Sequence, residues 1–411
     1  MIFFYVLKNV QATLRSTGQS IQFKPPRPAD ITSQRIPTGN IYFTTHAQFD
    51  RLVKSIPDAH SAIRVFDDLA VDMILNRDDF PRQIGFHRPG EEPDDIFREQ
   101  DKAVKIAVIN GMGTGIGDSI VGLRALDIFH ERIMPNHPDI SIDMFQRINP
   151  ALRPVYQRYQ SVNRTYDMPQ TLARLLGYDY FMSLEAFTLS QEFNSMPMID
   201  YYLAKLGMDP STVSDYEKRN TWPKPAAMGK NIDKALGNLL RSHKDKGYRR
   251  LLIHPVASDA IRSVPDAYIA RLIEFLIDNT DFILFSAVPV SCRHERFHDI
   301  SRYSKSIEDF IGIISRMDAV ITVDTSTFHI ADCFDVPTVV LFNTIHPRYR
   351  ISYYPHVRGI WLGEGKDPLS MRHGGFTGQD KAILDNIYKD FDYRNLLNEL
   401  DLAIQSVQSE E

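Results

Sequence analysis

One stretch of this 411-residue chain, Asp324 to His329, constrains its fold more than any other. It follows an apolar, β-branched run at residues 319–323, which predicts a buried strand, and it opens a short helix. A second apolar run at residues 337–342 comes next. Strand, helix and strand in this order predict a βαβ unit with two parallel strands.

The start of the helix after residues 319–323 is a predicted anion site. The first N–H groups of a helix lack internal partners, and the macrodipole adds partial positive charge there. A phosphate at Thr325, Ser326 and Thr327 would therefore be stabilised without a metal. His329 lies one turn after Thr325 and is placed either to donate a ring N–H to that phosphate or to make a structural hydrogen bond. Asp324 and Thr325 have an alternative role as helix caps.

A glycine-rich loop marks a second strand-to-helix junction, after a strand predicted at residues 104–110. Glycine permits positive φ and close approach to the backbone, so we expect the loop to admit a substrate. A dinucleotide fold would place an acidic residue about 20 residues further on, after a second strand, but the sequence there predicts a helix. The four glycines of this loop are Gly111, Gly113, Gly115 and Gly117.

Three segments, in chain order, resemble glycosyltransferase family 9, the ADP-heptose heptosyltransferases of the GT-B fold. They are GDSIVGLRAL, HPVASDAIRSVPDAYIARL and MDAVITVDTSTFHIADCFDVPTVVLFN, and the resemblance spans roughly residues 101–365. It implies an α/β protein with two Rossmann-like parallel-sheet domains facing a cleft. The region before residue 101 is an extra N-terminal module.

The resemblance also assigns roles to single residues. Asp118 matches the general base of the family, although its position equally suits a helix cap. Arg262 stands where the family usually has lysine and keeps the positive charge for the diphosphate. Asp324 matches the donor-site aspartate, with Ser326 in place of the usual glycine. Ser258 is expected to contact phosphate or to cap a turn, and Glu295 to contact the nucleoside or sugar.

The predicted domain boundaries follow changes in composition and the alternation of strands and helices. We expect an N-terminal accessory module at residues 1–100, an acceptor-side domain at 101–225, a nucleotide-sugar-binding domain at 226–378 and a helical tail at 379–411. Leu396, Leu397, Leu400 and Ile404 have the spacing of one helical face. We expect this face to dock back toward the first domain, as the resemblance implies.

Charge and cysteine content exclude several classes of function. A net charge of −5 disfavours a nucleic-acid partner. The two cysteines are too few for a disulfide framework or a four-cysteine zinc site and fit a reducing, cytoplasmic location. No apolar run is long enough to span a bilayer, so any membrane contact is expected to be peripheral. We expect no metal and no cofactor, because no Asp-x-Asp follows a strand and no His/Cys cluster has metal spacing.

These observations favour an inverting, metal-independent glycosyltransferase. Its donor is expected to be ADP-heptose or a similar nucleotide sugar. Its acceptor is expected to be a hydroxyl group of a bacterial glycan, of a lipopolysaccharide or of a protein. The expected process is lipopolysaccharide biosynthesis. One alternative is a catalytically inactive protein that binds a nucleotide sugar or glycan. Another is an NAD-dependent oxidoreductase using the glycine loop.

Overall fold

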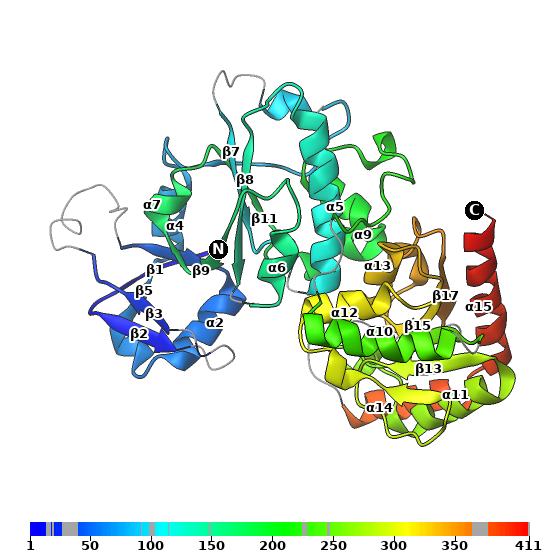
Figure 1. Cartoon of the computed structure of the whole chain (residues 1–411). Helices are drawn as coiled ribbons and strands as arrows, with labels where there is room; N and C mark the ends of the chain where they lie inside the picture. The colour runs from blue at the N-terminus through cyan, green and yellow to red at the C-terminus, as the bar shows by residue number, and fades with distance from the viewer. Residues whose placement is uncertain are drawn as a thin grey trace. The chain divides into compact units, whose positions relative to one another are not determined.

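The computed structural model describes residues 1–13, 18, 20–26, 40–91, 93–97, 103–113, 115–147, 149–223, 228–244, 247–363 and 377–409. The chain divides into two compact units (Figure 1). The first comprises Met1–Ser190 and Ile199–Val213, and the second comprises Gln191–Met198 and Ser214–Glu411. The domain boundaries predicted at 100/101 and 225/226 lie outside the described residues.

The N-terminal part of the first unit is built on an antiparallel sheet in the order β10-β4-β1-β5. Helix α2 begins after Thr45, whose hydroxyl accepts the Gln48 N–H. The elements of this part are β1 (Ile2–Val6), β2 (Val10–Thr13), β3 (Ser20–Phe23), β4 (Tyr42–Thr44), α2 (His46–Ser55), α3 (Ala59–Ala62), β5 (Ile63–Val65), α4 (Asp68–Leu75) and β10 (Gln170–Thr171).

A parallel sheet in the order β6-β11-β7-β8-β9 forms the rest of the first unit. Its apolar side chains share a core with the N-terminal sheet, and the rings of Phe43 and Phe145 lie 5.6 Å apart. The N-terminal part and the parallel sheet therefore share one apolar core. The elements are β6 (Arg82–Gln83), η1 (Pro93–Ile96), β7 (Lys105–Ile109), α5 (Ile116–Ile133), β8 (Ser141–Arg147), α6 (Leu152–Tyr156), β9 (Arg164–Met168), α7 (Leu172–Leu175), β11 (Tyr180–Ser183), η2 (Phe187–Leu189), α9 (Met198–Lys205) and η3 (Pro210–Thr212).

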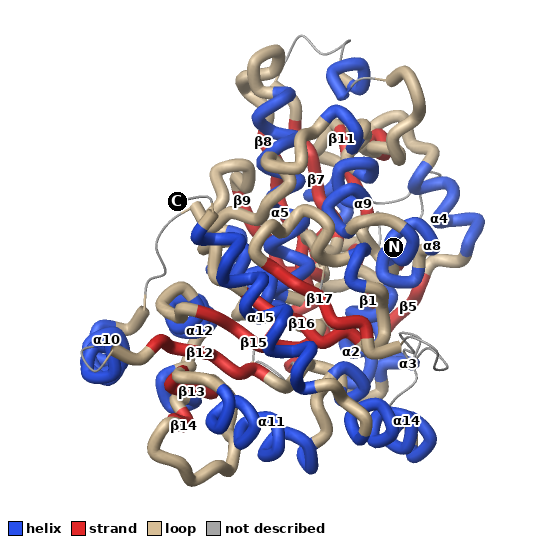
Figure 2. Tube along the Cα trace, turned by 90° about the vertical axis from the view of Figure 1, so that its right-hand side faces the viewer, coloured by secondary structure: helices blue, strands red, loops and turns tan. Residues whose placement is uncertain are grey.

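The second unit contains a six-stranded sheet in the order β14-β13-β12-β15-β16-β17, parallel throughout. Figure 2 shows β12, β15, β16 and β17 running side by side between helices. Its strands are β12 (Arg249–His254), β13 (Phe282–Ser286), β14 (Phe297–Asp299), β15 (Ala319–Val323), β16 (Thr338–Phe342) and β17 (Val357–Trp361), and its helical elements are α8 (Gln191–Ser195), α10 (Lys230–Lys244), η4 (Ala260–Arg262), α11 (Asp266–Asn279), η5 (Ser301–Tyr303), α12 (Ile307–Ile314), α13 (Ser326–Asp332), η6 (Pro347–Tyr349), α14 (Gly378–Lys389) and α15 (Tyr393–Gln408).

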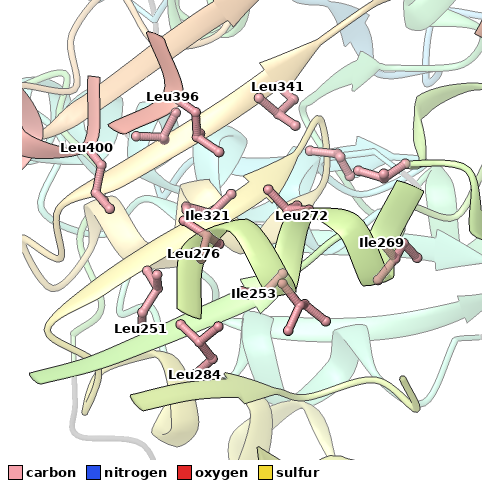
Figure 3. Packing of buried hydrophobic residues seen from close by; sticks show 14 of the residues in the cluster. Leu251, Ile253, Ile269, Leu272, Leu276, Leu284, Ile321, Leu341, Leu396 and Leu400 are labelled. Atoms are coloured by element: carbon pink, nitrogen blue, oxygen red, sulfur yellow. The ribbon is translucent and has the colours of Figure 1, made fainter. Parts of the chain in front are cut away.

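Helices cover both faces of this sheet, which explains why every residue of its strands β15 and β16 is buried and most are apolar. On one face, Leu272 and Leu276 of α11 pack on Leu251 and Ile321 (Figure 3). On the other face, α13 packs on β16 through Phe328, whose ring is 5.7 Å from that of Phe342.

The apolar face of the C-terminal helix exists as predicted, but α15 uses it within the second unit. Leu396 and Leu400 are buried in the same cluster as α11 (Figure 3). The helix contacts β16 and β17. The spacing of the leucines identified the buried face of the helix correctly. That face packs on the sheet of the second unit and not, as predicted, toward the first domain.

Most predicted strands and helices of the two parallel sheets are confirmed within one or two residues at each end. Thus the strand predicted at 319–323 is β15, and the helix predicted after the glycine loop is α5. Short strands such as β9 and β14 were not predicted. Their mixed polar and apolar sequences lack the pattern of a strand buried on both faces.

Candidate active site

Arg262, Asp324 and Ser258 lie together at the carboxyl edge of the second sheet. Asp324 directly follows β15 and is buried, whereas Ser258 and Arg262 lie in the loop after β12. Arg262 Nη1 is 3.5 Å from Asp324 Oδ2, and Arg262 Nη2 donates to Ser258 Oγ at 3.0 Å. A guanidinium carries five N–H donors in a fixed plane, so these two contacts hold its orientation while leaving donors for an anionic ligand.

The helix after Asp324 begins as predicted, and its first residues fall into two groups. Thr325, at the N-cap, makes no side-chain capping bond and is half-buried, as is Ser326. Thr327 is fully buried, and its hydroxyl lies 2.9 Å from His254 Nδ1. Burial lowers the pKa of His254 to about 4, so its ring is neutral near pH 7. Thr327 and His254 therefore brace the turn, and Thr325 and Ser326 are the residues open to a ligand.

His329 is also buried, and it is turned toward the protein. Its Nδ1 lies 2.7 Å from the Tyr354 hydroxyl, and burial together with the charge of Arg350 lowers the pKa of the imidazole to about 3. The ring carries no positive charge near neutral pH. The structural hydrogen bond considered for His329 is therefore present, and an N–H contact from its ring to a phosphate stays a prediction.

Two residues at this edge were not among the predicted site residues. Asn343 and Thr344 follow β16, the neighbour of β15. Asn343 Nδ2 donates to the Ile261 carbonyl at 2.8 Å, next to Arg262. Asn343 Oδ1 and the Thr344 hydroxyl are buried and have no hydrogen-bond partner among the described residues. Since buried polar atoms are normally paired, these two are candidates for ligand contacts. The sequence feature that could have identified them is their position directly after a buried strand.

Glu295 does not join this group. It is exposed in the turn just before β14, and the pairing of Phe297 with Leu284 places that turn at the amino edge of the parallel sheet. Asp324 and Arg262 lie at the opposite edge, after the strand ends. The sequence offered a weak match there because the connection between β13 and β14 has no regular pattern.

The glycine loop of the first unit follows β7, and its glycines make room for neighbouring side chains. A Cβ at Gly111 would lie 2.4 Å from the Tyr156 hydroxyl, and one at Gly113 would lie 2.6 Å from Asp118 Cβ and 3.0 Å from Phe187 Cζ. Gly111 and Gly113 also have positive φ, a conformation that glycine tolerates best. Packing against the protein is thus a structural reason for both glycines. Close approach of a substrate stays a prediction.

Two hydrogen bonds hold the loop over the start of α5. The buried Tyr156 hydroxyl accepts the Met112 N–H at 3.1 Å, and Asp118 Oδ2 accepts the Gly115 N–H at 3.1 Å. Gly117 is buried within the first turn of α5. The capping role considered for Asp118 is therefore present in the structure. A carboxylate has two oxygens and several acceptor positions, so the capping bond does not by itself exclude a contact with a substrate hydroxyl.

The comparisons with known proteins agree with the architecture of the two units. Residues 212–373 match the sequence pattern of "Glycosyltransferase family 9 (heptosyltransferase)". This part of the chain is similar to a glycosyltransferase family 9 domain. This match contains Arg262, Ser258 and the Asp324 turn. No curated protein matches by sequence.

Solved structures support the fold. The ADP-heptose lipopolysaccharide heptosyltransferase II of E. coli is 14% identical, with a TM-score of 0.50 over 75% of this chain and 100% of that chain. A family 9 glycosyltransferase from Veillonella parvula DSM 2008 is 10% identical, with a TM-score of 0.49 over 75% of this chain and 98% of its own. The predicted α/β class and GT-B fold are confirmed. Within the described part of the chain, no helix combines the length and apolar character of a membrane crossing.

Proposed function

We propose that this protein is an inverting glycosyltransferase that moves a sugar from a nucleotide sugar to a hydroxyl group without a divalent metal. The observation that carries the proposal is the Arg262, Asp324 and Ser258 cluster inside the family 9 domain. A cation held at the carboxyl edge of a parallel sheet, beside a helix start, suits the diphosphate of a nucleotide sugar.

In the proposed reaction, a carboxylate oxygen of Asp118 takes the proton of the acceptor hydroxyl. The acceptor oxygen then attacks the anomeric carbon from the face opposite the diphosphate. The bond from that carbon to the diphosphate oxygen breaks, and its electron pair leaves with the diphosphate. Arg262 and the N–H groups of Thr325 and Ser326 stabilise the charge that develops there.

ADP-heptose is the first donor to test, because the E. coli structure with similar architecture is named for it. The proposed acceptor is a hydroxyl of a bacterial glycan, a lipopolysaccharide or a protein. Both cysteines, Cys292 and Cys333, are free thiols, which supports a reducing, cytoplasmic location.

A thermal-shift screen with ADP, UDP, GDP, NAD and ADP-heptose tests the donor, because a ligand that binds the native state raises its stability. We expect ADP and ADP-heptose to raise the melting temperature. For each ligand, the increase should be the same with and without EDTA. Loss of binding in EDTA, with recovery in magnesium or manganese, would contradict the metal-free mechanism. NAD binding alone would favour an oxidoreductase, and ADP-heptose binding without turnover on any acceptor would favour an inactive binding protein.

A further inference from the structure

A small pocket in the first unit lies beside the glycine loop and is lined by two arginines. Its volume is about 170 Å³, below the roughly 300–1,000 Å³ of pockets that bury a whole ligand. It therefore suits one chemical group of a larger molecule. Arg147, the last residue of β8, lines it together with Arg51 of helix α2 in the N-terminal part of the chain.

Neither arginine has an ion pair or hydrogen bond among the described residues. Arg147 Nε is a buried donor without a partner. Burial lowers the pKa of Arg147, the nearby charge of Arg51 lowers it further, and Asp118 partly offsets this. Arg147 is half-buried and Arg51 is exposed. Two guanidinium groups held near each other repel, and a half-buried charge without an ion pair is costly. An anion between them would relieve both costs.

Glu185 also lines the pocket, and its carboxylate is already engaged. Glu185 Oε1 accepts the His46 N–H at 2.5 Å and contacts His46 Nδ1, while its Oε2 lies 2.6 Å from the amino group of Met1. These contacts direct Glu185 toward the N-terminal part of the chain. The charged side chains at the pocket are thus Arg51, Arg147 and Glu185, and Asp118 lies nearby.

The pocket also adjoins the proposed catalytic group. Phe187 lines it and comes within 3.0 Å of a Cβ built at Gly113, which in turn would contact Asp118. Asn110 lines it as well and directly precedes Gly111. A molecule with one group in this pocket would therefore lie beside the glycine loop and close to Asp118 in the first turn of α5.

We propose that this pocket binds a carboxylate or phosphate of the acceptor, so that the acceptor is anionic and the N-terminal part of the chain supplies one side of its binding site. The proposal rests on the proposed function, since it takes the molecule bound beside Asp118 to be the acceptor. It gives the N-terminal part a role in substrate selection, through Arg51 of α2. Thr45 and Gln48, which are buried at the start of α2, also line that side of the pocket.

The test is isothermal titration of the full chain with glucuronate, glucose 6-phosphate and neutral glucose, at low and high salt. We expect at least one anionic sugar to bind about tenfold or more tightly than glucose. That preference should weaken about tenfold or more in Arg51→Gln and in Arg147→Gln, as for a charged hydrogen bond, and should fall with added salt. Binding of glucuronate alone would assign the group as a carboxylate, and binding of glucose 6-phosphate alone would assign it as a phosphate.

Arg88→Gln is the matched control, because Arg88 belongs to the same unit and its side chain is 80% exposed. Anionic sugars that bind no better than glucose, or a loss in Arg88→Gln equal to that in the pocket variants, would overturn the proposal. ADP binding, measured in the same samples, separates the two hypotheses. If ADP binds and the anionic sugars do not, only the acceptor proposal fails, whereas failure of ADP to bind counts against the proposed function itself. A melting temperature equal to that of the wild type shows that the first unit, which contains Arg51 and Arg147, is folded in each variant.

Discussion

At the carboxyl edge of the second sheet, the cation Arg262 has a carboxylate partner in Asp324, whereas Arg147 at the edge of the first sheet has none among the described residues. The turn after β15 is braced from within by Thr327 and His254, and the loop after β7 by Tyr156. Both edges thus have a rigid loop, but they differ in how charge is balanced. A paired arginine keeps its geometry without a ligand, and unpaired arginines gain most when a ligand arrives.

The largest expected effect tests the chemical role of the first edge. Asp118→Asn should lower transfer by roughly 10²–10⁴, the usual contribution of a general base, while ADP binding by the second unit is retained. Transfer is measured as ADP release that depends on the acceptor. The exposed Asp139 supplies the control variant Asp139→Asn, which should behave as wild type. Wild-type turnover in Asp118→Asn would leave Asp118 with only its capping bond.

Arg262→Ala tests the paired arginine of the second edge. Removing a charged hydrogen bond to phosphate costs about 1.5–3 kcal/mol, so ADP should bind roughly 10- to 150-fold more weakly, with little change for adenosine. Calorimetric titration of both ligands measures the difference. Arg293→Ala, at an exposed position of the same unit, serves as the control. Equal weakening of ADP and adenosine would point to packing rather than phosphate binding.

The second unit should lose stability in mild acid because its buried histidines are neutral. The pKa of His254 is lowered to about 4 and that of His329 to about 3, so between pH 6.5 and those values the unfolded chain binds more protons. Burial raises the pKa of Asp332 to about 7, so in this range the folded chain holds a proton on Asp332 that the unfolded chain lacks. This proton offsets the effect of one of the two histidines on stability. The net loss between pH 6.5 and pH 5 is about 1.5 kcal/mol, because each unfolded histidine is only half protonated at pH 6.5.

Urea unfolding followed by tryptophan fluorescence measures this loss, since the only two tryptophans, Trp222 and Trp361, belong to the second unit. His254→Gln should make the dependence on pH shallower. Unchanged stability between pH 6.5 and pH 5 would show that the histidines titrate alike in the folded and unfolded states.

The smallest expected effect concerns the brace of the glycine loop. Tyr156→Phe removes the acceptor of the Met112 N–H and should cost about 1 kcal/mol, the net value of one ordinary hydrogen bond. Hydrogen exchange at the Met112 amide should become faster, and transfer should fall less than in Asp118→Asn. Tyr159→Phe is the comparison variant, because Tyr159 is a nearby tyrosine that does not bond the Met112 N–H. Exchange that stays as slow as in wild type would mean that the loop is held by its backbone alone.

Much of the fold was predictable, because parallel strands covered on both faces leave strong local signals. β15 and β16 are continuous apolar runs followed by polar residues, and their βαβ connection follows from that order. The resemblance to glycosyltransferase family 9 then selected the topology. Strands such as β14, at the edge of the sheet, have no such signal and were missed.

The candidate site was predictable only in part. Ser258, Arg262 and Asp324 meet as expected, since each follows the carboxyl end of a parallel strand. Glu295 lies at the other edge because the register of β14 decides its place. Asn343 and Thr344 were visible after a strand, but only burial shows that their oxygen atoms lack partners.

The sequence by itself determined which segments become buried strands, where the chain turns toward ligands and where charge was available, because those properties depend on neighbours a few residues away. Only the tertiary structure decided which polar groups are already satisfied. It turned His329 toward Tyr354 and brought Arg51 and Arg147, nearly 100 residues apart in the chain, to one pocket. Pairing and burial in a folded chain are long-range properties, and they set which groups remain for a substrate.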